Sequence, residues 1–97
     1  MVDRDEARRR ALEYIQRLAQ GRAYELVLLE EHTREEDFGW VFTYNTRQFL
    51  ETREMKSALG GNAPIIVDRD SGEVHVTGTA HALAYYLDAY RRQRKPA

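Results

Sequence analysis

The segment from Asp68 to Gly72, with the sequence DRDSG, carries side chains that could hold a metal ion. Two aspartates followed by a serine resemble the start of a calcium-binding loop, in which oxygen atoms surround the ion. The glycine stands one position early for such a loop, and Thr79 occupies the position of its bidentate glutamate. Aspartate, serine and glycine also favour tight turns. We therefore interpret this segment as a hairpin turn, and we predict no metal and no cofactor.

The other reactive side chains do not form a catalytic pattern. His32, His75 and His81 lack the short spacing of a histidine metal motif, and the chain has no cysteine. Ser57 and Ser71 stand outside the motif that presents a nucleophilic serine. The sequence therefore predicts a protein that is not an enzyme and has no catalytic residues.

A group of acidic residues in the first half of the chain is a candidate for partner binding. No apolar surroundings are expected to raise the pKa of these carboxylates, so they should form a solvated acidic rim. Such a rim would speed the encounter with a basic partner and help to select it. The rim consists of Glu30, Glu31, Glu35, Glu36 and Asp37.

Two other segments could suggest a phosphate or nucleic-acid ligand. Gly60-Gly61 precedes an apolar run and lacks the lysine and hydroxyl residue of a phosphate-binding loop. The basic residues from Arg91 to Lys95 follow a helical stripe, where cations also stabilise a helix C-terminus. The formal net charge of −1 provides no positive field. We therefore predict no nucleic-acid partner.

Length and composition indicate one small folded domain. The 97 residues have room for a single core, so we assign 1–97 to one domain. Hydrophobic residues at 42% and charged residues at 32% argue against disorder. The first residues lack the apolar core of a signal peptide, and no apolar run approaches the ~20 residues of a membrane span. We expect a cytoplasmic protein with no membrane contact.

A helix is predicted near each end of the chain. The first has Asp3 as its cap, an apolar stripe at helical spacing over 11–19, and Gly21 at its end. The last is predicted to begin after a cap at Thr79 and to run to about Arg94.

Two hairpins are predicted between these helices, separated by an irregular link over 45–59. The first joins a strand over 24–32 to a strand over 38–45, and the second joins 65–67 to 74–77 across the turn at Asp68–Gly72. This order predicts an α+β fold, with a four-stranded antiparallel sheet and both terminal helices packed on one face. An aromatic row is predicted to face the core: Phe38, Trp40, Phe42 and Tyr44.

Packing both helices on one face would leave the other face of the sheet uncovered. Val27, Leu29 and Val41 would lie there as a partly apolar patch. Exposed patches of this kind usually bind a partner protein or a second copy of the chain. We therefore expect a monomer, or a homodimer formed through this face.

Three segments carry a resemblance to a known family: Gly39–Asn45 (GWVFTYN), Gly61–Asp68 (GNAPIIVD) and Gly78–Tyr90 (GTAHALAYYLDAY). Together they resemble the YrhB-like domain family, which includes predicted immunity proteins of bacterial polymorphic-toxin systems. The resemblance extends from the first helix to the last, and it departs from the family at Ala63, where a glycine is typical. The matching residues are structural, and the family brings no catalytic residues.

The resemblance implies a small cytosolic protein that acts by binding another protein. As an immunity protein it would neutralise a cognate toxin by stoichiometric binding. The alternative is a chaperone-like holding protein that uses the uncovered sheet face, and an enzyme acting through Glu31 or Asp37 stays a third hypothesis. The predicted contacts are the acidic rim, the end of the link at Gly61 and Asn62, and the patch of Val27, Leu29 and Val41.

Overall fold

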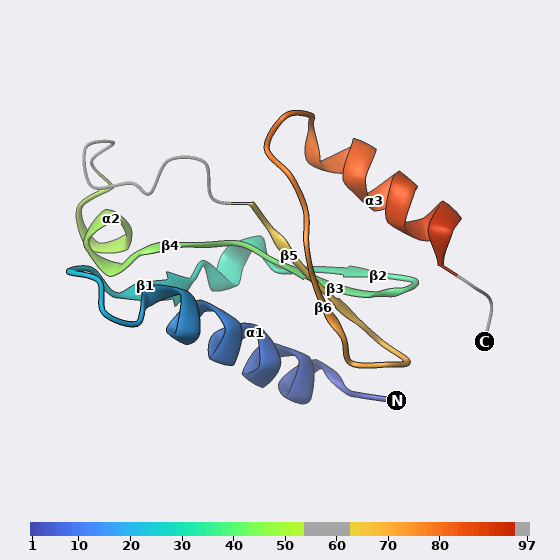
Figure 1. Ribbon diagram of the computed structural model, residues 1–97, viewed down its shortest axis with the longest axis horizontal. Helices are drawn as coiled ribbons and strands as arrows, with labels where there is room; N and C mark the ends of the chain where they lie inside the picture. Colours follow the sequence, from blue (N-terminus) through green and yellow to red (C-terminus); the bar gives the residue numbers. More distant parts are fainter. Residues whose placement is uncertain (54–62, 95–97) are drawn as a thin grey trace.

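In the computed structural model, which describes residues 1–53 and 63–94, a layer of strands lies between two helices (Figure 1). Helix α1 (Arg4–Ala19) lies on one side of the layer and helix α3 (Leu83–Gln93) on the other. A short helix, α2 (Arg47–Thr52), follows the first group of strands. The fold is α+β, as the sequence predicts.

The strands of the described residues form two antiparallel sheets. The larger sheet has the order β2-β3-β5-β6, and the smaller one pairs β1 with β4. The prediction of antiparallel pairing is confirmed, but two sheets replace the single four-stranded sheet. The strands are β1 (Leu26–Leu28), β2 (Arg34–Glu36), β3 (Gly39–Phe42), β4 (Tyr44–Thr46), β5 (Ile65–Asp68) and β6 (Val74–Val76).

The first predicted hairpin is a ribbon that bends in its middle. Leu28 lies opposite Tyr44, and further along the ribbon Arg34 lies opposite Val41. Between these two pairs one side of the ribbon advances by six residues and the other by three. The 3-10 helix η1 (Glu30–His32) takes up the three extra residues.

This bend corrects three predicted boundaries. The strand predicted over 24–32 ends before η1, and residues from the gap left between the two predicted strands pair with the neighbouring strand as β2. The strand predicted over 38–45 is divided at Thr43 into β3 and β4. The Leu29 N–H donates to the Thr43 carbonyl at 2.8 Å, which keeps the two sides of the ribbon together at the bend.

Helix α1 and the second hairpin form as the sequence predicts. Asp3 Oδ1 accepts a hydrogen bond of 2.8 Å from the Glu6 N–H, which caps the helix. The apolar stripe of α1 is buried at Ala7, Ala11 and Ile15. In the turn between β5 and β6, Gly72 adopts a left-handed φ of +73°, a conformation that glycine adopts without steric cost.

The two helices cover opposite faces of the larger sheet. Trp40 and Val67 pack against α1, whereas Val41 and Ile66 pack against Leu87 of α3. Neighbouring residues of a strand point to opposite faces, so β3 and β5 are apolar on both sides. The prediction that both helices pack on one face is wrong, because strands of this kind need a cover on each face.

Both faces of β3 are therefore covered, and the uncovered sheet face that the sequence predicts is not found there. Val41 is only 1% exposed beneath α3, and Leu29 is 6% exposed. Val27 is half-buried between its buried neighbours in β1. The side chains of Val41 and Leu29 are thus not available to a partner, which corrects the role predicted for them.

Helix α3 begins at Leu83 and not directly after Thr79. The hydroxyl of Tyr86 accepts hydrogen bonds from the N–H groups of Ala80 (3.0 Å) and His81 (3.1 Å). A threonine cap would satisfy such N–H groups by its own hydroxyl, and here a side chain from within the helix does so. The irregular link is also partly helical, since α2 forms within it, and its residues 54–59 lie outside the described residues.

Two glycines with positive φ provide a matched test of the packing between β3 and β5. Gly39 has a φ of +151°, and a Cβ there would come within 2.1 Å of the Val67 carbonyl oxygen. Gly21 has a φ of +78°, and a Cβ there would meet nothing within 4 Å. We predict that Gly21→Ala lowers the free energy of unfolding by about 1–2 kcal/mol through backbone strain alone. Gly39→Ala should cost clearly more, about 3 kcal/mol or above, because overpacking adds to the strain.

Urea denaturation of both variants beside the wild type measures this difference. Equal losses of unfolding free energy in the two variants would contradict the close approach of β5 to Gly39.

Candidate functional site

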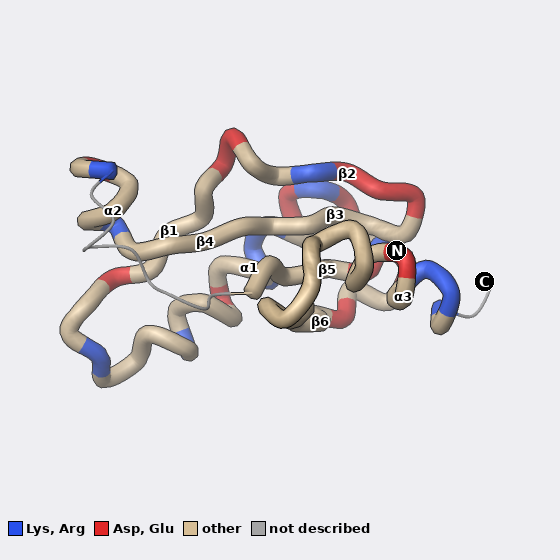
Figure 2. Tube along the Cα trace, turned by 90° about the horizontal axis from the view of Figure 1, so that it is seen from above, with Lys and Arg blue, Asp and Glu red and all other residues tan. Residues whose placement is uncertain are grey.

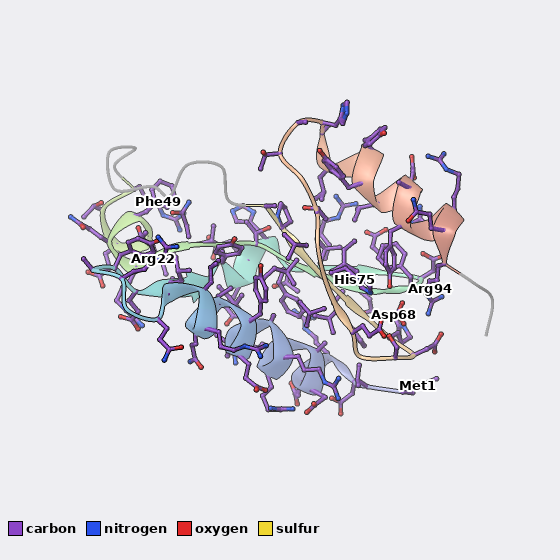
Figure 3. The ribbon with its side chains drawn as sticks, viewed as in Figure 1. Met1, Arg22, Phe49, Asp68, His75 and Arg94 are labelled. Atoms are coloured by element: carbon purple, nitrogen blue, oxygen red, sulfur yellow. The ribbon has the colours of Figure 1, made fainter. Side chains whose placement is uncertain are left out.

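A shallow groove between β6 and α3 is the candidate binding surface. It consists of two adjoining hollows of about 320 and 270 Å³, and both are bordered by His75, Tyr90 and Gln93. Two large hydrophobic side chains stand exposed near it, Val76 at 48% and Tyr85 at 52%. Figure 3 shows His75 near the C-terminal end of α3, where Arg94 and Asp68 also lie.

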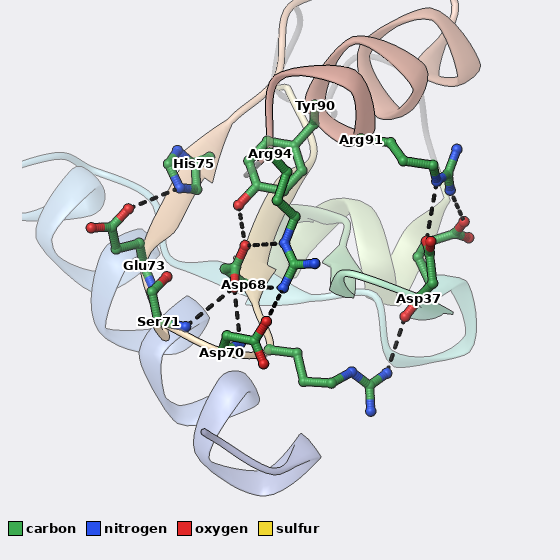
Figure 4. A network of polar contacts seen from close by, with 11 residues as sticks. Asp37, Asp68, Asp70, Ser71, Glu73, His75, Tyr90, Arg91 and Arg94 are labelled. Atoms are coloured by element: carbon green, nitrogen blue, oxygen red, sulfur yellow. Dashed lines mark hydrogen bonds and ion pairs between the residues drawn. The ribbon is translucent and has the colours of Figure 1, made fainter. Parts of the chain in front are cut away.

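The end of the groove near the β5–β6 turn is built on the buried carboxylate of Asp68 (Figure 4). Its Oδ1 accepts hydrogen bonds from the N–H groups of Asp70 (2.9 Å) and Ser71 (3.2 Å). Arg94 donates through Nε to Oδ2 at 2.9 Å and through Nη2 to Oδ1 at 3.2 Å. The Tyr90 hydroxyl donates to Oδ2 at 2.5 Å. This carboxylate fastens α3 to the β5–β6 hairpin.

The network fixes the protonation of its members at neutral pH. The hydrogen bonds from Arg94 hold the pKa of the Asp68 carboxyl well below its usual range, and the Tyr90 hydroxyl adds to this effect. Burial raises the pKa of Tyr90 above its usual range, and the hydrogen bond to Asp68 raises it further. Asp68 is therefore ionised, and Tyr90 keeps the proton that it donates.

The same network explains why the aspartates of this turn do not form a calcium loop. The Arg94 guanidinium pairs with Asp68 at 2.9 Å and with Asp70 at 2.5 Å, so it occupies the place where a metal cation would lie. Among residues 1–53 and 63–94 there is no group of three or more histidine and acidic side chains that could hold a metal ion. In the same residues, no helix is long and apolar enough to cross a membrane.

The three histidines that the sequence analysis considers as possible metal ligands lie in different surroundings. His32 lies in η1 beside Glu31. His75 contacts the groove, with Nε2 at 3.3 Å from a Glu73 oxygen and its ring 5.0 Å from that of Tyr90. The His81 ring lies 4.2 Å from the Tyr85 ring, just before α3.

Every carboxylate of the predicted acidic rim forms an ion pair with an arginine of the same chain. These pairs lie in two places, at η1 and along the β2–β3 hairpin, and Figure 2 shows acidic and basic positions next to each other along β2. The rim is thus divided and largely neutralised. The N···O distances lie between 2.6 and 3.1 Å in Glu30–Arg8, Glu31–Arg53, Glu35–Arg69, Glu36–Arg91 and Asp37–Arg91.

The remaining predicted contacts have different outcomes. Gly61 and Asn62 lie outside the described residues. The groove was not predicted from the sequence. With α3 predicted on the same sheet face as α1, a surface between α3 and β6 on the other face was not expected. The run Ile65-Ile66-Val67 could have indicated a helix on each face of the sheet, because a strand without polar alternation is typical of burial on both faces.

Substitution of Asp68 tests the network at the end of the groove. We predict that Asp68→Asn lowers the free energy of unfolding at pH 7 by about 1.5–3 kcal/mol, because hydrogen bonds to a charged group are lost. Tyr90→Phe is the matched control, since it removes one hydroxyl and leaves the ring and the Arg94 ion pair in place. It should cost less than Asp68→Asn.

The dependence of stability on pH gives a second test of Asp68. Its pKa is lower in the folded than in the unfolded chain, where it is near 3.9. Its stabilisation is therefore complete above this value and is lost as the pH falls towards the folded pKa. The wild type should lose more stability between about pH 5 and pH 2 than Asp68→Asn does. Equal losses in urea titrations at both pH values would contradict this role.

Comparison with known proteins places this fold in a family. The family model of Immunity protein 35 matches residues 5–93. The uncharacterized protein YrhB of Escherichia coli (strain K12) is 52% identical over 52 residues, which cover 54% of this chain and 55% of that protein. The match thus spans about half the length of this curated relative, and no solved structure matches the chain. The chain belongs to the Immunity protein 35 family.

Proposed function

We propose that the chain is an immunity protein that neutralises a cognate bacterial toxin by stoichiometric binding. In this proposal it acts in the cytoplasm of the cell that makes it, and it transforms no substrate. The family match over residues 5–93 carries the proposal, because it covers α2, α3, all the strands described above and α1 from its second residue.

The residues in and around the groove between β6 and α3 favour the proposal that the partner is a protein. Tyrosine side chains are frequent among the residues that dominate binding energy at protein interfaces. Tyr85 is half exposed, and its ring lies 5.3 Å from that of Tyr86, so the two tyrosines form an ordered aromatic surface. Val76 adds exposed apolar area near the same hollow. Such a surface gains stability when a partner covers it.

The acidic positions have a secondary role in this proposal, as contacts at the border of the interface. Exposed ion pairs contribute about 0–1 kcal/mol, so pairs such as Glu30–Arg8 can be exchanged for pairs with a partner at little cost. Charges at such a border mainly change the rate of association and its dependence on salt. The part proposed for Gly61 and Asn62 rests on the sequence alone.

The alternative of a general holding protein loses the observation that suggested it. That alternative needed an uncovered apolar sheet face, and α3 covers Val41 and Ile66 on that face. Self-association through the same face loses its basis for the same reason.

Co-expression with the toxic products of neighbouring genes tests the proposal. We expect the chain to restore growth in the presence of one of these toxins and to form a 1:1 complex with it. Tyr85→Ala should weaken this complex at least about tenfold, as expected for an exposed aromatic side chain that an interface buries. Arg17→Ala, an exposed position on α1, is the control and should leave the affinity unchanged.

Titration calorimetry measures the stoichiometry and both affinities. If no neighbouring gene product is toxic or binds the chain, the proposed function is wrong. If Arg17→Ala weakens the complex and Tyr85→Ala does not, the toxin binds on the α1 side.

A further inference from the structure

The two borders of the larger sheet differ in the side chains that they carry. β2 forms one border and β6 the other, and Figure 2 shows charged positions along β2 and none within β6. Each residue of β2 is charged and engaged in an ion pair: Arg34 with Glu36, Glu35 with Arg69, and Glu36 also with Arg91. Charged edge strands resist pairing with another chain. The sequence of β6, Val74-His75-Val76, has no such protection.

The register of β5 and β6 shows which backbone groups face outward. The Asp68 N–H donates to the Glu73 carbonyl and the Thr77 N–H to the Pro64 carbonyl. Paired residues alternate between bonded and non-bonded in an antiparallel ladder, so His75 bonds to Ile66 between these two pairs. The N–H and C=O groups of Val74 and Val76 therefore point away from β5.

These outward groups have no hydrogen-bond partner within residues 1–53 and 63–94. Neither Val74 nor Val76 takes part in any of the backbone or side-chain hydrogen bonds of the described chain beyond the β5–β6 ladder. Two N–H and two C=O groups, separated by one residue, are the set that an added β-strand would bind.

The surroundings of β6 indicate the chemistry of a strand that could pair there. A residue placed opposite His75 would share its face of the sheet and lie at the border of the groove with Tyr86 and Tyr90. Glu73 lies at the start of this edge, 69% exposed, with a carboxylate oxygen 3.3 Å from His75 Nε2 and no arginine partner within residues 1–53 and 63–94. A basic side chain opposite Glu73 on the added strand would form an ion pair with it, because opposite charges across two strands attract.

We propose that an extended segment of the partner protein adds to the sheet as a strand beside β6. Its backbone binds the outward groups of Val74 and Val76. An apolar or aromatic side chain fills the border of the groove, and a lysine or arginine pairs with Glu73. This inference rests on the proposed function, in which the segment belongs to the toxin.

Substitution of Val76 by proline tests the backbone part of this proposal. Proline removes the outward N–H of Val76 and no bond of the ladder to β5, a position where edge strands tolerate proline. Val76→Thr is the matched control, because it keeps the N–H and nearly the same shape. The probe is the toxin encoded beside the gene for this chain, made inactive by substitution. We expect the Kd of Val76→Pro to be at least about tenfold higher than that of Val76→Thr, because Val76→Thr measures the loss of apolar area alone and Val76→Pro also removes the N–H.

Glu73→Lys tests the charge part and should also raise the Kd, more strongly at low salt. Circular dichroism and thermal unfolding of each free variant show that it is folded. Hydrogen exchange adds a measurement that needs no substitution, since the amides of Val74 and Val76 should exchange rapidly in the free chain and slowly in the complex.

Three results would overturn the inference while the proposed function stands. The first is a Val76→Pro variant that binds the toxin as tightly as Val76→Thr. The second is protection of other amides in the complex without protection at Val76. The third is protection of the Val76 amide in the free chain that rises with its concentration, which would show that a second copy occupies the edge. A wild-type chain that binds no neighbouring toxin would instead contradict the proposed function, and this inference with it.

Discussion

The attachment of α3 to the rest of the molecule depends on the buried carboxylate of Asp68. Helix α3 has one buried residue, Leu87, and Leu83 and Tyr90 pack partly buried beside it. Asp68 adds hydrogen bonds from Tyr90 and Arg94 on the helix, and the turn residues Asp70 and Ser71 satisfy its remaining capacity. A carboxylate with this many donors is stable in a buried place because little of its hydration is left unreplaced. The position of α3 in turn covers one sheet face and forms one wall of the groove.

Those parts of the fold that local chemistry determines could be predicted from the sequence. The Asp3 cap, the apolar stripe of α1 and the left-handed Gly72 each depend on residues within a few positions. The side of the sheet on which α3 packs depends on contacts between Leu87, Val41 and Ile66, which are distant in the chain. The bend of the first ribbon, between β1–β4 and β2–β3, could not be predicted from the sequence either. Three residues in η1 reverse the alternation, so that even-numbered side chains face α1 in β1 and odd-numbered ones do so in β2.

In the candidate site, too, features set by neighbouring residues could be predicted, and features set by residues distant in the chain could not. The acidic positions were visible in the sequence, but their arginine partners were not, since Glu35 pairs with Arg69 and Asp37 with Arg91 across long stretches of chain. A local excess of negative charge therefore became a nearly neutral surface on folding. The groove could not be predicted either, because it exists only where β6 and α3 meet. Val76, which borders it, and Tyr85, which is exposed on α3, are ordinary members of a strand and a helix when they are viewed separately.

Trp40 has a consequence for how this protein can be observed. It is the single tryptophan of the chain, and it is buried between α1 and the sheet. The guanidinium of Arg69, from the turn after β5, lies 4.7 Å from the centre of its ring and also binds Glu35 of β2. This indole thus lies where α1, the larger sheet and the turn after β5 meet. Its ultraviolet emission is a built-in optical signal for their assembly, and no foreign dye has to be attached.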